Sequence, residues 1–178
     1  MIELQSFQQL CPEIRIFAKA HWENSFLTLL FEWQDPEALI VWNTEKTLGQ
    51  QRRDGLWQNT CFELFLSEPG RENYFEFNLS SSGEWNTYAF TSYRQPQPPR
   101  ATEEWQLVNF SRTQSQCQSR WQTLKVCPEL ELAFCSVIKT KTGSTHYFSS
   151  KHLKEKADFH WRPGMSVSLK AQEAGETQ

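Results

Sequence analysis

A chain of 178 residues, 38% of them hydrophobic, is long enough for one domain with a single core. Its 13 Phe and 8 Trp predict that this core is rich in aromatic side chains. The formal net charge of -3 offers no concentrated basic surface, which excludes nucleic acid as an expected partner.

Alternation of apolar and polar residues, typical of half-buried strands, predominates along the chain. The predicted strands are short and are separated by turn residues. In chain order they are Ile14–Ala18, Phe26–Trp33, Ala38–Trp42, Thr60–Leu66, Tyr74–Leu79, Trp85–Tyr93, Trp105–Phe110, Arg120–Val126, Leu130–Ile138, Thr145–Ser149 and Met165–Leu169. Such a series favours an all-β sandwich or barrel over a parallel α/β sheet. We expect one β-sandwich domain over residues 1–170 and a polar C-terminal tail over residues 171–178.

The segment from Thr60 to Tyr93 predicts three consecutive antiparallel strands, with turns at residues 68–71 and 80–83. One face of the first two strands is apolar and predicts the core between two sheets: Phe62, Leu64, Leu66, Phe75, Phe77 and Leu79. The other face is mixed: Cys61, Glu63, Phe65, Tyr74, Glu76, Asn78 and Ser80. Aromatic rings stack on sugar rings, while carboxylate and amide groups bond sugar hydroxyls, so this second face suits a polyhydroxylated ligand.

Two features concern the compartment. Residues 1–17 contain neither a basic segment nor an apolar run of the kind that forms a leader, and no apolar run elsewhere is long enough to span a bilayer. The five cysteines, Cys11, Cys61, Cys117, Cys127 and Cys135, are odd in number and lack a C-x-x-C spacing. We therefore expect a cytoplasmic protein with free, mostly buried thiols and no membrane partner.

The prolines of residues 95–100 predict a loop, and residues 151–156 predict an exposed loop or a short helical turn.

Three parts of the sequence carry a family resemblance. They are LWQNTCFELF at residues 56–65, YFEFNLSSSGEW at 74–85 followed by Tyr93-Arg94, and DFH at 158–160 preceded by Ser149-Ser150. In combination, over about residues 10–170, the chain resembles the DOMON-like group related to carbohydrate-binding module family nine. This resemblance implies an immunoglobulin-like antiparallel β-sandwich.

The resemblance also implies a binding site. In the sugar-binding relatives a saccharide is held between two tryptophans, and a carboxylate follows the first tryptophan closely in sequence. Trp57 with Glu63 is similar to that first pair, and Trp161, or alternatively Trp85, is implied as the second wall. The implied polar contacts are Arg52, Arg53, Asn78 and Arg94. We therefore expect a non-catalytic module that binds a carbohydrate or a related polar small molecule.

Two alternatives stay open at this point. Other members of the wider superfamily bind haem, and His160 with Met165 is the candidate axial pair, although their odd spacing would send them to opposite faces of a continuous strand. A structural or protein-interaction domain is the second alternative. Glu63 and Glu76 are paired carboxylates, but no nucleophile motif, phosphate loop or metal cluster accompanies them, so we expect neither an enzyme nor a bound cofactor. The sequence leaves the oligomeric state open.

Overall fold

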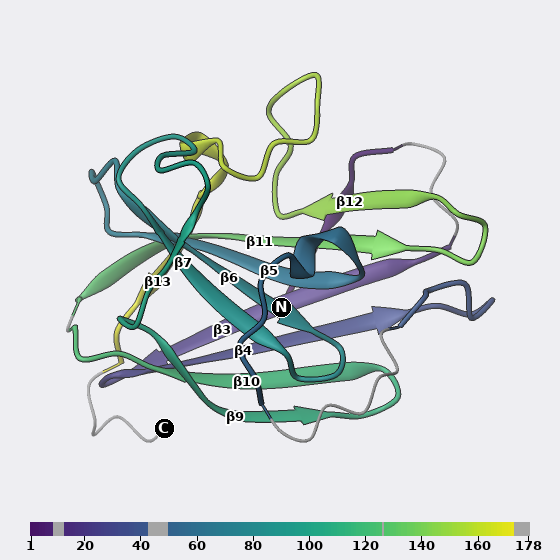
Figure 1. The fold of residues 1–178 in the computed structure, drawn as a ribbon, viewed down its shortest axis with the longest axis horizontal. Helices are drawn as coiled ribbons and strands as arrows, with labels where there is room; N and C mark the ends of the chain where they lie inside the picture. Colours follow the sequence, from purple (N-terminus) through teal and green to yellow (C-terminus); the bar gives the residue numbers. More distant parts are fainter. Residues whose placement is uncertain (9–12, 43–49, 126, 173–178) are drawn as a thin grey trace.

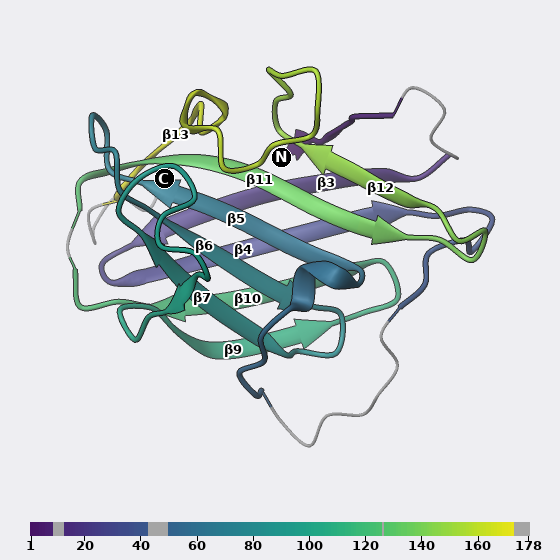
Figure 2. The same ribbon diagram turned by 45° about the horizontal axis from the view of Figure 1, so that its top comes forward.

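In the computed structural model, which describes residues 1–8, 13–42, 50–125 and 127–172, two antiparallel sheets pack face to face (Figure 1, Figure 2). Over these residues the first sheet has the strand order β1-β3-β4-β10-β9. Its strands are β1 Ile2–Glu3, β3 Arg15–Glu23, β4 Phe26–Gln34, β10 Gln116–Gln122 and β9 Gln106–Arg112. The predicted antiparallel β-sandwich is confirmed.

The second sheet carries the site and has the order β2-β12-β11-β5-β6-β7-β8, with β13 also paired to β11. Its strands are β2 Gln5–Ser6, β12 Thr145–Ser149, β11 Glu129–Lys139, β5 Cys61–Ser67, β6 Tyr74–Ser80, β7 Trp85–Phe90, β8 Arg100–Ala101 and β13 Val167–Lys170. Two 3-10 turns, η1 Leu56–Gln58 and η2 Arg162–Gly164, are the helical elements of the described residues. Neither is long enough to cross a membrane, and no longer helix occurs in that part of the chain.

The core lies between the two sheets and is built by the strand faces that alternation predicted. Phe62, Leu64, Leu66, Phe75, Phe77 and Leu79 all belong to this buried cluster. Phe62 stacks on Phe31 of β4 at a centroid distance of 4.8 Å, and Phe77 meets Trp121 of β10 edge-on at 5.0 Å. Contacts of this kind between large rings join the two sheets, because aromatic pairs bury much apolar area.

Several predicted boundaries differ from the structure. Ala38–Trp42 is not a strand: the Asp35 carboxylate accepts hydrogen bonds from the amides of Leu39 and Ile40, which ties the chain into a turn, and Ile40 alone forms a bridge, to Thr140. The three consecutive strands predicted over Thr60–Tyr93 form a meander, β5-β6-β7. Its third strand ends at Phe90 instead of continuing to Tyr93, since residues 91–95 form a turn closed by the pairing of Ser92 with Gln95.

The remaining differences are small. β10 begins and ends earlier than the predicted Arg120–Val126, and Val126 lies outside the described residues. The structure adds three short strands that alternation over two residues cannot reveal: β1, β2 and β8. Residues 151–156 form an exposed loop.

Four of the predicted free thiols are confirmed as buried and unpaired with one another: Cys61, Cys117, Cys127 and Cys135. Cys11 lies outside the described residues, as do residues 173–178 of the predicted tail. The first two residues of that tail are attached to the sandwich, because the amides of Ala171 and Gln172 donate to the carbonyls of Pro128 and Trp22.

Candidate functional site

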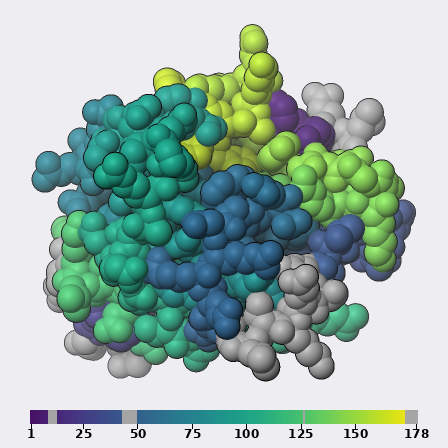
Figure 3. Space-filling view, viewed as in Figure 1, coloured from purple at the N-terminus to yellow at the C-terminus, as the bar shows by residue number. Residues whose placement is uncertain are grey.

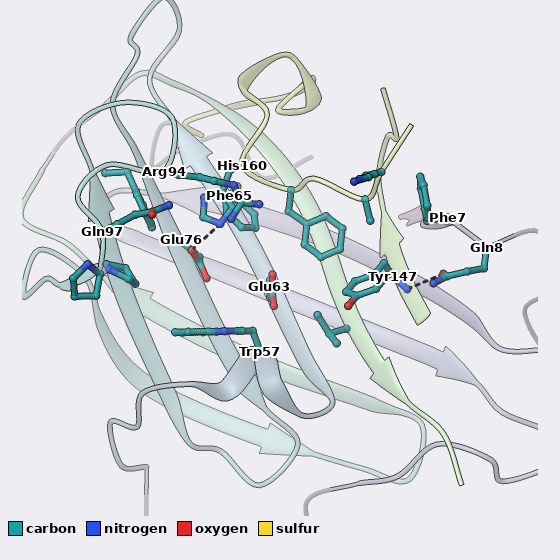
Figure 4. A pocket seen from close by; sticks show the side chains of 17 residues that line it. Phe7, Gln8, Trp57, Glu63, Phe65, Glu76, Arg94, Gln97, Tyr147 and His160 are labelled. Carbon is teal, nitrogen blue, oxygen red and sulfur yellow. Dashed lines mark hydrogen bonds and ion pairs between the residues drawn. The ribbon is translucent and has the colours of Figure 1, made fainter. Parts of the chain in front are cut away.

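A pocket of about 850 Å³ lies on the outer face of the second sheet, away from the inter-sheet core. Its floor comes from β5 and β6, and its walls come from η1, the loop after β7, the loop after β12 and the residues after β2 (Figure 4). The lining residues are Phe7, Gln8, Trp57, Glu63, Phe65, Glu76, Phe90, Arg94, Gln97, Pro98, Pro99, Val137, Tyr147, Lys156, Ala157, Phe159 and His160. The segments that carry these walls, distant in sequence, meet on the face drawn in Figure 3.

Strand register places the two carboxyls of the floor. In the β5–β6 pair Glu63 lies opposite Asn78, and Phe65 lies opposite Glu76. Glu63 and Glu76 are thus diagonal neighbours on one face of the sheet, close enough for their side chains to interact. The predicted mixed face is real, but it is covered: Glu63 is only 3% exposed and Glu76 only 5% exposed.

Burial makes the two carboxyls unlike ordinary surface glutamates. Loss of water, together with the nearby charge of Glu76, raises the pKa of Glu63 well above its usual range. Burial also raises the pKa of Glu76 to about 7, against the opposing effects of a hydrogen bond from Asn78 and the charge of Arg94. Asn78 Nδ2 donates to Glu76 Oε1 at 2.7 Å, whereas Glu63 Oε1 has no hydrogen-bond partner among the described residues.

His160 closes the pocket beside Glu76. Its Nδ1 lies 2.8 Å from the Tyr74 hydroxyl, and its Nε2 lies 3.7 Å from Glu76 Oε2. The Tyr74 hydroxyl also accepts a hydrogen bond from the Arg94 amide, and the tautomer of His160 sets which of Nδ1 and the Tyr74 hydroxyl donates to the other. Burial, helped by the charge of Arg94, lowers the pKa of His160 to about 3. The imidazole is therefore neutral at pH 7, as is Tyr74, whose pKa burial raises to about 12.

Trp57 forms the wall at η1. Its ring meets the edge of Tyr88 at a centroid distance of 5.7 Å, and the Tyr88 hydroxyl donates to Asp54 Oδ1 at 2.7 Å. Tyr88 comes from β7, where it pairs with Glu76 on the pocket face. Trp57 is 36% exposed as a residue, so its ring is supported from the sheet side and still accessible from the pocket.

The loops that close the pocket are anchored by Asp158. This carboxylate accepts hydrogen bonds from Tyr93, Arg94 and Lys154 at 2.8, 3.1 and 2.8 Å. Burial acts in the opposite direction, but these three bonds hold the pKa of Asp158 below its ordinary value. The loop after β7 and the loop after β12 are thereby joined above the sheet.

Four of the eight sequence-predicted site residues gather at the pocket. Trp57, Glu63 and Arg94 line it, whereas Asn78 is fully buried and reaches it only by donating a hydrogen bond to Glu76 of the floor. The structure does not bring the other four to the pocket: Arg52, Arg53, Trp85 and Trp161.

Trp85 lies on the wrong face for a pocket wall. It pairs with Leu79 in the β6–β7 register, so its side chain points into the core, where it meets Trp121 edge-on at 5.5 Å. The guanidinium of Arg52 covers the Trp85 ring at 4.1 Å and donates to Asn86 Oδ1. Trp85 and Arg52 therefore pack and brace the end of the sheet.

Arg53 and Trp161 also have contacts outside the pocket. Arg53 pairs with the buried Glu84 at 2.7 Å, beside the turn between β6 and β7. Trp161 is 38% exposed, and Lys154 Nζ lies 3.8 Å above its ring, on the outer side of the Asp158 anchor.

Several pocket residues were not in the predicted site. Tyr147 and Phe159, whose rings lie 6.1 Å apart, supply an aromatic wall, and Gln8 is held there because its Oε1 accepts from the Tyr147 amide at 3.2 Å. The DFH segment at 158–160 was a recognisable signal for Phe159 and His160. Gln8 and Tyr147 carry no such signal, because their place depends on the pairing of β2 with β12.

No profile of a known protein family matches this sequence, and no curated protein matches it either. Solved structures do resemble it. A proposed carbohydrate-binding protein from Bacteroides uniformis superposes with a TM-score of 0.66 at 13% identity, over 96% of this chain and 87% of that chain. This chain shares its β-sandwich fold.

Two further structures are of a carbohydrate-binding module of family 9 from Caldicellulosiruptor kristjanssonii. The complex with glucose matches with a TM-score of 0.62 at 11% identity, over 99% of this chain and 87% of that chain. The complex with cellotriose matches with a TM-score of 0.61 at 10% identity, over 98% and 85%. At such low identity the likeness establishes the fold of this chain.

Proposed function

We propose that this protein is a non-catalytic module that binds a carbohydrate, or a related polar small molecule, in the pocket beside Trp57. The observation that carries the proposal is that an accessible indole and two buried carboxyls line the same pocket (Figure 4). A sugar ring has apolar C–H faces that stack on an indole and hydroxyls that bond carboxyl oxygens, so one pocket offers both kinds of contact.

The proposed contacts follow from the lining. Trp57 stacks on the sugar ring, and Tyr147 with Phe159 takes the place of the second tryptophan that the family resemblance implies. Glu63 and Arg94 supply hydrogen bonds, while Asn78 acts indirectly by holding Glu76. The neighbours solved with glucose and cellotriose make these two sugars the first ligands to try. A DOMON-like relationship is part of the same proposal.

Binding without catalysis fits the position of the carboxyls. Glycoside hydrolysis uses two carboxyls that flank the scissile bond. Glu63 and Glu76 lie side by side in the floor, on adjacent strands, so both would face the same side of a ligand. That arrangement supports recognition of hydroxyls.

A haem site is not supported by these residues. An axial histidine needs a free ring nitrogen directed at the iron. His160 Nδ1 is engaged by Tyr74, its Nε2 faces Glu76, and Met165 packs in a buried cluster with Phe65 and Tyr74 without lining the pocket. We infer that titration of the purified protein with haemin leaves the Soret band of haemin unchanged; a stoichiometric shift would revive the haem alternative.

Isothermal titration calorimetry with glucose, cellobiose and cellotriose tests the proposed function. We expect saturable heats with at least one of the three, and galactose and glucuronate extend the series to other hydroxyl patterns and to a charged sugar. The proposal would be abandoned if the folded protein gave no heat with any member of this series and no rise in melting temperature with any of them.

A further inference from the structure

We propose that Glu63 takes part in ligand binding as a carboxylic acid that donates a hydrogen bond, so that the pocket requires an acceptor oxygen on the ligand above β5. This inference rests on the proposed function, because it concerns the same pocket. It adds the chemical form of one contact and the ligand group which that contact selects.

The first support is the closeness of two acidic groups in one buried floor. Strand register makes Glu63 and Glu76 diagonal neighbours, and Figure 4 shows both carboxyls directed into the pocket. Two carboxylates that share a water-poor site repel one another, so the pair keeps one proton at a pH where surface glutamates have none.

The second support is an asymmetry that decides which member keeps the proton. Glu76 Oε1 accepts from Asn78 Nδ2 at 2.7 Å, its Oε2 faces His160 Nε2 at 3.7 Å, and the charge of Arg94 favours its ionised form. Glu63 has no comparable donor, and its Oε1 is buried and unpartnered among the described residues. When the pair holds a single proton, the negative charge therefore settles on Glu76 and the proton on Glu63.

The other titratable groups around the pair do not offset the two causes that raise the pKa of Glu63, which are burial and the charge of Glu76. From the elements packed against the two carboxyls they are Cys61 of β5, Tyr74 of β6, Tyr88 of β7, Cys135 of β11, and Arg94, Lys156, Asp158 and His160 of the loops. Burial raises the pKa of the Cys61 and Cys135 thiols and of both phenols, so these four stay neutral near pH 7. Arg94 is already paired with Asp158 at 3.1 Å.

The consequence for the ligand is directional. A carboxylic acid has one O–H to donate, and a buried donor without a partner is costly to leave unpaired. A ring ether, glycosidic or carbonyl oxygen of the ligand above Glu63 would accept this hydrogen bond. Such an oxygen has no proton to donate, so an ionised Glu63 would repel it, and affinity must fall as the pair loses its proton.

Calorimetry of the best saccharide between pH 5 and pH 9 tests this. For the wild-type protein we expect affinity to fall by about tenfold per pH unit once the shared proton is lost, since one proton is linked to binding. Glu63→Gln carries a permanent N–H donor, so its affinity should not follow this fall. Glu32→Gln, on β4 of the other sheet, is the matched control and should keep the wild-type profile. A flat wild-type profile, or an unchanged fall in Glu63→Gln, would overturn the inference.

A measurement without ligand separates the two proposals. The infrared spectrum at pH 8, above the pKa of about 7 of Glu76, should contain the C=O band of a protonated carboxylic acid, and Glu63→Gln should lose it while Glu32→Gln keeps it. Absence of that band in the wild type would overturn the inference whatever the ligand. A protein with the band that binds no saccharide would overturn the proposed function, and with it the ligand contact, while leaving Glu63 protonated.

Discussion

Glu63 and Glu76 lie on adjacent antiparallel strands as diagonal neighbours, and their carboxyls form the floor of one pocket although each is almost fully buried. A surface glutamate pair would be solvated and would have little effect on stability. Here both side chains are enclosed by Trp57, Phe65 and the loops, so their protonation is coupled to folding as well as to the proposed binding.

The first prediction concerns stability against pH. The pKa of Glu76 is raised from 4.5 to about 7, so between these values the native state holds a proton that the unfolded chain releases, and stability falls as pH rises. His160 acts in the opposite sense: burial lowers its pKa to about 3 from the ordinary value of 6.5, so between these values stability rises with pH. The effects of Glu76 and His160 on stability oppose each other below pH 6.5. Above that pH the effect of Glu76 alone lowers stability further, up to its pKa of about 7.

Glu76→Gln removes the ionisation while keeping the shape of the side chain. We expect the stability of this variant relative to wild type, measured as the difference in the free energy of unfolding, to be ~2 kcal/mol greater at pH 8 than at pH 5. Urea unfolding at both pH values measures this, with Glu32→Gln as the control that should show no such difference. An equal effect of Glu76→Gln at both pH values would mean that Glu76 titrates as a solvated group.

The second prediction compares two tryptophans of similar exposure. Trp57→Ala should lower saccharide affinity by about tenfold or more, because it removes a stacking face. Trp161→Ala deletes an indole outside the pocket and should leave affinity within about twofold of wild type. Calorimetry measures the saccharide affinity of both variants, after circular dichroism has verified that each is folded. The reverse ranking would move the site to the surface beside Tyr93.

The third prediction concerns the core face. Phe77→Ala should lower the free energy of unfolding by about 3 kcal/mol, since it leaves a cavity against Trp105 and Trp121. Leu124→Ala is the control: Leu124 is 94% exposed, and its loss should change stability by less than about 0.5 kcal/mol. Denaturant unfolding measures both. Similar small effects would mean that the inner and outer faces of β6 are exchanged.

The fourth prediction uses two glycines with positive φ. Gly70, at φ 72, has open space around it, so Gly70→Ala should cost only the backbone penalty of about 1 kcal/mol. Gly83, at φ 90, lies where an added Cβ would sit 2.9 Å from Phe110 Cδ1, so Gly83→Ala adds a steric overlap between the sheets. Thermal melts should rank Gly83→Ala as clearly less stable than Gly70→Ala. Equal melting temperatures would contradict the close approach of Phe110 to the turn.

Alternation predicted much of the fold because it is a local property. Phe62 and Phe77 face the core and Glu63 and Glu76 face away from it, as the period of two requires. Trp85 shows the limit of this reasoning. Both alternating sets of β7 contain aromatic residues, so only the pairing of Trp85 with Leu79 reveals which set faces inward. The predicted strand at Ala38–Trp42 failed because Asp35 captures the amides of Leu39 and Ile40, a side-chain contact that apolar pattern does not report.

The residues of the candidate site also fall into those that the sequence could predict and those that it could not. Trp57, Glu63 and Arg94 were recognisable from short motifs, whereas Gln8 and Tyr147 reach the pocket only through the pairing of β2 with β12.

The amino-acid sequence by itself determined the antiparallel strands of the meander, their inner and outer faces and the mixed character of the outer face, because each of these follows from neighbours one or two residues apart. Tertiary structure alone decided that the outer face is enclosed, which tryptophan borders the pocket, and how strongly burial shifts the pKa of Glu63 and Glu76. These properties depend on loops from distant parts of the chain that exclude water from the sheet, and exclusion of water is a through-space effect.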